Sequence, residues 1–243
     1  MSALKNKVAL ITGGSRGIGR AIALALAREG CHVALTGRNA AALEEVAAAA
    51  RAMGVNAAPI ARDLAEPSSA AQIMDQTVSA LGPVDFLVNN AAVLHATALL
   101  DTTAGQWDET MAINLRSVFL LSQLVLRHMA GRRSGYIVNI ASTVAHGAKQ
   151  DVAAYSVSKY GLVGLSHALH GAAKPFGVRV STIYPGVTDT PLVRELNGDH
   201  SVGEPNQWMQ PEDVAYCVLF LLQQSPRMIV KELTPWAFAY DKI

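Results

Sequence analysis

Residues 8–19 read VALITGGSRGIG, and this stretch decides the fold. Its first four residues are apolar and predict a strand buried in a parallel sheet. The alanine-rich residues 20–27 predict a helix, which Gly30 would end. Glycines between a strand and a helix permit a tight turn whose backbone N–H groups approach a pyrophosphate, and the helix N-terminus favours its negative charge. The stretch therefore predicts a dinucleotide site, and the alternative is a purely structural glycine turn.

Six further apolar runs follow, and helical stretches separate them. The seven runs lie near residues 8–11, 33–36, 55–61, 84–88, 136–141, 178–184 and 228–232. Strands that alternate with helices predict an α/β fold, a mostly parallel sheet with helices on both faces. Pro59 in the third run favours an edge strand. This agrees with a Rossmann-type, doubly wound sheet of order 3-2-1-4-5-6-7, which binds its ligand at the carboxyl ends of strands 1 and 4.

The bulk composition predicts a single domain spanning residues 1–243, because no linker or repeat divides the chain. The segment from Ala40 to Ala52 predicts an amphipathic helix with Leu43, Val46 and Met53 on one stripe. We expect no membrane span and no secretory signal, and therefore a cytoplasmic protein with reduced cysteines. The two cysteines and the spacing of the seven histidines predict no metal site.

The charge of the chain bears on its partners. A net charge of +1 gives no electrostatic reason to expect nucleic acid or an anionic membrane. Charged residues make up 16% of the chain, against about 25% in ordinary soluble domains. Because charged residues are depleted in subunit contacts, we expect a homotetramer or homodimer, with the apolar run from Val118 to Met129 and the aromatic tail in need of cover.

Tyr155, Lys159 and Ser142 form the candidate catalytic group. Residues four apart on a helix lie on one face, so Tyr155 and Lys159 are expected to point into the same space. A free phenol has a pKa of about 10, and a nearby ammonium group favours the phenolate. We therefore expect Lys159 to lower the pKa of Tyr155 toward the working range of an acid or base.

Several motifs occur in one order along the chain. They are the glycine loop 12–19, Asp63, the Asn-Asn-Ala-Ala turn 89–92, Asn114, the group Ser142, Tyr155 and Lys159, and the segment 185–190 that begins Pro-Gly. From residue 7 to about residue 230 the chain thus resembles the compact branch of the short-chain dehydrogenase/reductases. Ala92 stands where that family usually has glycine.

The resemblance implies hydride transfer between a nicotinamide and a carbon of the substrate. Tyr155 would be the general acid or base, Lys159 would hold the nicotinamide ribose, and Ser142 would steady the developing oxyanion. The resemblance also implies that Asn114 would bind a water that links Lys159 to solvent. From the sequence alone, Asn114 is more simply a core amide that satisfies a neighbouring backbone group. The cofactor-binding residues are then Gly13, Ser15, Arg16, Gly17, Ile18, Gly19, Arg38, Asp63, Leu64, Asn90, Ala91, Tyr155, Lys159, Pro185, Gly186, Val187, Thr188 and Thr190.

The end of the second apolar run predicts NADP(H) as the cofactor. NAD sites place an acidic residue about twenty residues beyond the glycine loop, but here Gly37 holds that position. Arg38 follows it, and Arg16 lies within the glycine loop. Two guanidinium groups provide charge-assisted hydrogen bonds for a 2′-phosphate. The alternative is that both arginines are solvated surface residues.

The expected substrate is a small hydrophobic ketone or aldehyde, because the predicted pocket is mainly apolar. The pocket residues are Leu94, Val144, His146, Val152, Leu192 and Trp208, with residues 191–208 as a lid. His146 is either a polar contact to the substrate or incidental.

Two other functions stay open. A 3-oxoacyl-carrier-protein reductase needs a basic docking patch near the pocket mouth, for which Arg132, Arg133 and Lys174 are candidates, although Phe176 and Val152 speak against it. The other is an NADP(H)-binding regulatory protein without catalysis. The tail with Trp236, Phe238 and Tyr240 packs either on its own domain or across a subunit boundary.

Overall fold

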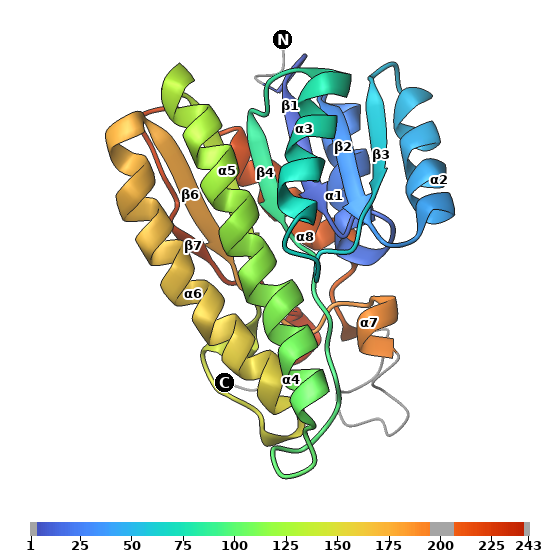
Figure 1. Cartoon of the computed structure of the whole chain (residues 1–243), viewed down its shortest axis with the longest axis vertical. Coiled ribbons are helices and arrows are strands. Elements are labelled where there is room, and N and C mark those ends of the chain that lie inside the picture. Colours follow the sequence, from blue (N-terminus) through green and yellow to red (C-terminus); the bar gives the residue numbers. More distant parts are fainter. Residues whose placement is uncertain (1–3, 195–206, 241–243) are drawn as a thin grey trace.

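The computed structural model describes residues 4–194 and 207–240. Within them, seven parallel strands form one sheet of order β3-β2-β1-β4-β5-β6-β7 (Figure 1). The strands are β1 (Val8–Thr12), β2 (His32–Gly37), β3 (Ala57–Ala61), β4 (Phe86–Asn89), β5 (Gly135–Ile140), β6 (Val178–Ile183) and β7 (Glu232–Leu233). The predicted fold class and strand order are confirmed, and Pro59 lies in the edge strand β3.

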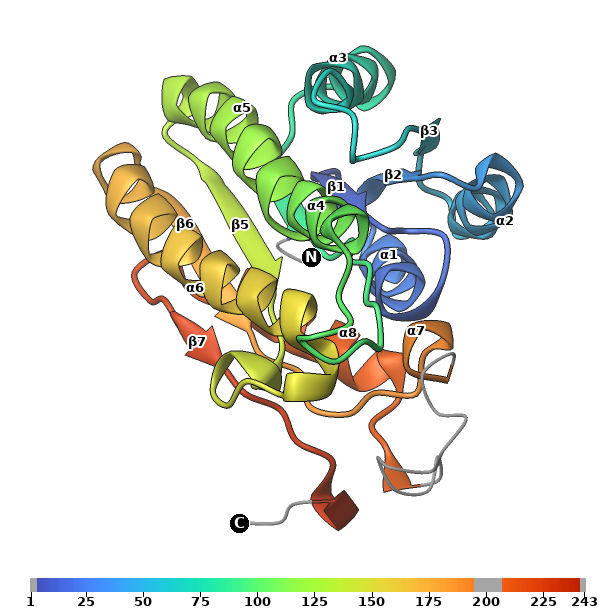
Figure 2. The same cartoon turned by 60° about the horizontal axis from the view of Figure 1, so that its bottom comes forward.

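Helices cover both faces of the sheet (Figure 2). The α-helices are α1 (Gly17–Arg28), α2 (Ala40–Arg51), α3 (Ser69–Leu81), α4 (Ala104–Met111), α5 (Ser117–Arg132), α6 (Ala153–Ala173), α7 (Pro191–Arg194) and α8 (Pro211–Leu222). Shorter helical turns are η1 (Ala112–Arg116), η2 (Thr143–Ala145), η3 (Gln150–Val152), η4 (Lys174–Phe176) and η6 (Phe238–Tyr240). Successive strand residues face opposite ways, so Ile11 packs with α1, α2 and α8, whereas Leu10 packs with α3, α5 and α6.

Two expected apolar segments end differently from the prediction. Met53 lies beyond the end of α2 and is 38% exposed, whereas Leu43 and Val46 are buried. The last strand is only Glu232–Leu233, not residues 228–232. Met228 and Val230 instead accept hydrogen bonds from side chains of β6. Arg179 donates to the backbone carbonyl of Met228, and Ser181 donates to that of Val230.

The expected lid falls mostly outside the described residues, since only α7 and residues 207–208 of the segment 191–208 are described. No helix in the described part of the chain is long and apolar enough to span a membrane. The same residues hold no group of three or more potential metal ligands from histidine, cysteine, aspartate and glutamate.

Candidate active site

A cavity of about 870 Å³ opens at the carboxyl ends of the central strands. Its volume is in the range of sites that hold a small ligand or cofactor. Most of the predicted site residues line it, from Gly13 and Arg38 at one end to Tyr155 and Val187 at the other. Three predicted residues do not line it, namely Gly19, Asn114 and Trp208.

The glycine loop lies against the turn that follows β4. Gly13 has a φ of +68°, a conformation that side chains other than glycine rarely adopt. A Cβ atom at Gly19 would overlap the carbonyl oxygen of Gly13, so this position behind the loop has no room for a side chain. Thr12 Oγ1 accepts hydrogen bonds from the backbone N–H groups of Asn90 and Ala91 at 2.9 and 3.0 Å. The glycine loop therefore borders the cavity with its backbone, an arrangement that fits a pyrophosphate.

Tyr155 and Lys159 lie one turn apart near the start of α6, and both are buried. Lys159 Nζ is 5.4 Å from the centre of the Tyr155 ring and donates a 2.8 Å hydrogen bond to the carbonyl oxygen of Ile140. Burial raises the pKa of Tyr155 to about 12, against the lowering effect of a hydrogen bond with the Ser142 side chain. Burial also lowers the pKa of Lys159 to about 7.

The expected decrease of the Tyr155 pKa is therefore wrong, because burial raises this pKa instead. Removing both groups from water disfavours their charged forms, and for Tyr155 this outweighs the opposite effect of the hydrogen bond with Ser142. At neutral pH the Tyr155 phenol keeps its proton. A protonated phenol is the form that a general acid needs when a carbonyl is reduced.

The buried ammonium group makes stability depend on pH. An unfolded lysine binds its proton up to a pH of about 10.4, whereas folded Lys159 releases it near pH 7. Between these values the unfolded state binds more protons, so the stability of the folded state rises with pH. Below about pH 7 the folded state bears the full free-energy cost of burying the charged Lys159 side chain.

We expect Lys159→Met to gain stability relative to the native protein as the pH falls from 9 to 6. The Tm difference should change by about 5–10 °C, because about two pH units of this window lie above the folded pKa, each is worth about 1.4 kcal/mol, and 1 kcal/mol moves Tm by about 2–4 °C. Differential scanning calorimetry of the cofactor-free proteins measures this. Lys174→Met, at an exposed lysine, is the control and should show a constant difference; a constant difference for Lys159→Met would contradict the lowered pKa.

Asn114 lies in a π-helical turn, η1, between α4 and α5. Such turns are often found at functional sites. Its side-chain oxygen accepts from the backbone N–H of Val93 at 2.8 Å, and its amide nitrogen donates to the Val93 carbonyl and to Ser158 Oγ at 2.9 and 3.0 Å. The side chain thus acts as a core amide that fixes the chain after β4, and the water-binding role stays a prediction.

The end of the cavity near Arg16 and Arg38, where the sequence predicts the adenosine part of the cofactor, contains a further arginine that was not predicted. Arg62 lines the cavity together with Arg16 and Arg38, and its Nε atom is buried without a hydrogen-bond partner in the described residues. The sequence held one signal for this role, because Arg62 directly precedes Asp63, a predicted cofactor-binding residue. Arg38 is 62% exposed at its side chain, and its Nη1 atom is 3.7 Å from a carboxylate oxygen of Glu109.

Five of the six residues predicted for the substrate pocket line the cavity, namely Leu94, Val144, His146, Val152 and Leu192. The ring of His146 packs on Tyr184, with 4.4 Å between the ring centres. Trp208 is buried outside the lining.

Trp236 from the tail lines the cavity instead and packs against Gly186. The tail therefore packs on its own domain at this residue, whereas the Phe238 side chain is fully exposed.

Residues 7–201 match the short chain dehydrogenase family. The chain is 34% identical to sepiapterin reductase of Chlorobaculum tepidum over 93% of this chain and 94% of that protein. It is 32% identical to the 3-oxoacyl-acyl-carrier-protein reductase of Vibrio cholerae over 94% of this chain and 95% of that one. It also matches the glycine betaine reductase of Emericella nidulans at 32% identity, but spans only 18% of that protein's length.

Solved structures agree with this assignment. A short-chain dehydrogenase/reductase of Mycobacterium marinum superimposes with a TM-score of 0.90 at 32% identity, covering 96% of this chain and 95% of that chain. A short chain dehydrogenase of Burkholderia cenocepacia, solved in complex with NADP, gives a TM-score of 0.88 at 35% identity over 97% and 98% of the two chains. The chain belongs to the short-chain dehydrogenase/reductase family and is an oxidoreductase that acts on CH–OH groups.

Proposed function

We propose that the protein is an NADP(H)-dependent reductase of small ketones or aldehydes, formed by one cytoplasmic domain of residues 1–243. The observation that carries the proposal is the geometry at the apolar end of the cavity, where the buried Tyr155 lies beside Lys159 and lines the cavity together with Ser142. At the opposite end the cavity is lined by Arg16, Arg38 and Arg62, and Gly37 stands where NAD sites have an acidic residue. Both features favour a cofactor with a 2′-phosphate.

The nicotinamide, when bound, supplies the hydride. Tyr155 donates its phenolic proton to the substrate oxygen, and the Ser142 hydroxyl stabilises the negative charge that develops there. Lys159, whose Nζ lies beside the Tyr155 ring, holds a nicotinamide ribose and returns the phenol to its protonated form. The backbone of the glycine loop and the segment 185–190 hold the rest of the cofactor.

The 3-oxoacyl-carrier-protein reductase is the competing function. Its candidate patch, Arg132, Arg133 and Lys174, precedes strands β5 and β6 and therefore lies at their amino ends. The cavity opens at the carboxyl ends, so this patch does not border the cavity of its own subunit. Arg132 is also paired with Asp85 at 3.2 Å.

A substrate panel separates the two functions. We expect NADPH oxidation with small hydrophobic ketones and aldehydes at a higher kcat/KM than with 3-oxoacyl thioesters of an acyl-carrier protein. The measurement is the nicotinamide absorbance at matched substrate concentrations. A clear preference for the carrier-bound thioester would favour the competing function.

We also propose that the protein is a homotetramer or homodimer. The run from Val118 to Met129 supports this less than expected, because Val118, Leu121, Val125 and Met129 are buried in the chain's own core. Exposed apolar side chains elsewhere support it better, and they include Phe119 on α5, Val157 and Tyr160 on α6, and Tyr216 and Phe220 on α8.

Light scattering at micromolar concentration is expected to give two or four times the chain mass of 25.7 kDa. Tyr160→Asp places a charge on the exposed face of α6 and should shift the mass toward that of one chain. A fully active native protein with a mass near 25.7 kDa would contradict the assembly.

A further inference from the structure

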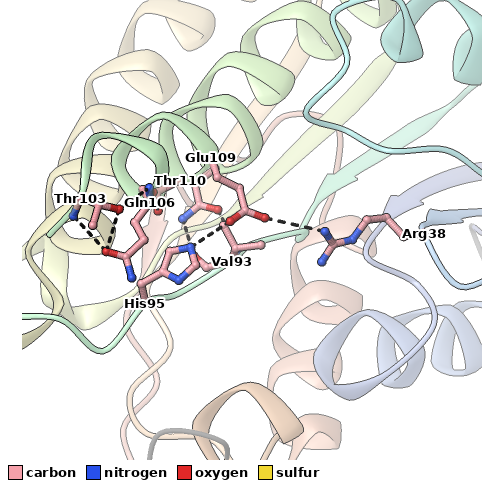
Figure 3. Close-up of polar contacts among 8 residues, drawn as sticks. Arg38, Val93, His95, Thr103, Gln106, Glu109 and Thr110 are labelled. Atoms are coloured by element: carbon pink, nitrogen blue, oxygen red, sulfur yellow. Dashed lines mark hydrogen bonds and ion pairs between the residues drawn. The ribbon is translucent and has the colours of Figure 1, made fainter.

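Three charged or polar side chains form a line beside the adenosine end of the cavity (Figure 3). Glu109 of α4 is in the middle. One of its carboxylate oxygens is 3.7 Å from Arg38 Nη1, and the other is 3.0 Å from His95 Nε2. Arg38 follows β2 and His95 follows β4, so Glu109 joins segments that are distant in the sequence.

The short helix α4 fixes the position of Glu109. Thr103 and Gln106 form a capping box at its start, in which the Thr103 side chain accepts from Gln106 N–H and the Gln106 side chain accepts from Thr103 N–H. Thr110 Oγ1 donates to the Gln106 carbonyl at 2.7 Å. With His95 bound to its second oxygen, Glu109 is the anchored partner, and the more exposed Arg38 is the side chain that can leave.

The Arg38–Glu109 pair joins two segments that both contribute residues to the cavity lining. Arg38 lines the cavity with its neighbours Gly37 and Asn39. Ile113, four residues beyond Glu109 in the turn η1, lines the same cavity. A ligand group that binds Arg38 therefore meets a guanidinium that a nearby carboxylate already attracts.

We propose that Glu109 is a specificity-determining residue that competes with a 2′-phosphate for Arg38. The inference rests on the proposed NADP(H) site. In the cofactor-free protein Glu109 neutralises part of the Arg38 charge, and with NADP(H) bound it repels the phosphate at short range. A cofactor without this phosphate meets no such repulsion. Glu109 therefore lowers the preference for NADP(H) below the value that the arginines alone would give.

A purely structural role of Glu109 makes a different prediction. If Glu109 only held the segment around His95, its loss would weaken adenosine binding with or without the 2′-phosphate. Glu109→Gln separates the two roles, because glutamine keeps the shape and a hydrogen bond to His95 but lacks the charge. Asp108→Asn is the matched control, since Asp108 is an exposed carboxylate on the same helix.

The test is calorimetric titration of the full chain with adenosine 2′,5′-bisphosphate and with 5′-AMP, which differ only in the 2′-phosphate. Glu109→Gln is expected to bind the bisphosphate about 3- to 10-fold more tightly than the native protein does, the range expected for losing an exposed ion pair and a nearby repulsion. The affinity for 5′-AMP should stay within about 2-fold, as should both affinities of Asp108→Asn. Arg38→Gln in the Glu109→Gln background should remove the gain.

Unchanged or weaker binding of the bisphosphate by Glu109→Gln, or an equal change for both probes, would overturn the inference. If the native protein prefers the bisphosphate and Glu109→Gln does not add to that preference, the proposed cofactor stands and the inference is wrong. If the native protein binds both probes equally and Glu109→Gln prefers the bisphosphate, the inference stands and the proposed cofactor preference is wrong.

Discussion

Tyr155→Phe is expected to lower kcat by about 10²- to 10⁴-fold, the usual cost of removing a general acid. The phenol of Tyr155 is buried and keeps its proton at neutral pH, so it is the available proton donor beside Ser142. Phenylalanine retains the ring that packs in the cavity, and the Kd of NADPH should therefore change little. Steady-state turnover of a good ketone and a fluorescence titration with NADPH measure the two quantities.

Tyr160→Phe is the matched control for this experiment. Tyr160 lies on the same helix as Tyr155, but its side chain is exposed and outside the cavity. Removal of its hydroxyl should leave kcat close to the native value. Near-native turnover by Tyr155→Phe would show that another group donates the proton, and the mechanism would be wrong.

The second large effect concerns the cofactor. The native protein should bind NADPH on the order of 100-fold or more tightly than NADH, since each charge-assisted hydrogen bond from an arginine contributes about 1.5–3 kcal/mol. Arg38→Asp should narrow or reverse this difference, because it replaces a cation beside the 2′-phosphate with an anion. Equilibrium titration of both cofactors against both proteins measures the change.

Arg28→Asp is the control for the change of charge. Arg28 is exposed at the carboxyl end of α1, before β2, and so lies at the opposite edge of the sheet from the cavity. Its replacement should leave the ratio of the two affinities unaltered. Equal affinities of the native protein for NADPH and NADH would count against the arginine site.

The sequence predicted the parts of the fold that depend on local pattern. Short apolar runs between helices gave the strands, and Pro59 marked the edge strand because proline cannot donate a ladder hydrogen bond. The glycine loop was recognisable because its backbone conformation requires glycine at defined positions, as the φ of Gly13 illustrates. The residues that line the cavity near this loop were therefore largely predictable.

Properties that arise from the assembled cavity were not predictable in the same way. The pKa of Tyr155 rises because burial outweighs the hydrogen bond with Ser142, and the spacing of Tyr155 and Lys159 does not reveal the extent of burial. Trp236 reaches the cavity from the tail, and Glu109 meets Arg38 from a different helix. Contacts of this kind depend on how distant segments pack, for which a single sequence holds no local signal.

The central claim is that this chain transfers a hydride from NADPH to a carbonyl carbon. The most direct measurement incubates the native protein with NADPH deuterated at the transferable position and with a panel of small ketones and aldehydes, and follows the products by NMR. Hydride transfer by this chain predicts deuterium on the carbinol carbon of at least one product, with one NADPH consumed for each alcohol formed. Tight binding of NADPH without deuterium in any product of this panel or of 3-oxoacyl thioesters would contradict it and would favour a catalytically silent NADP(H)-binding protein.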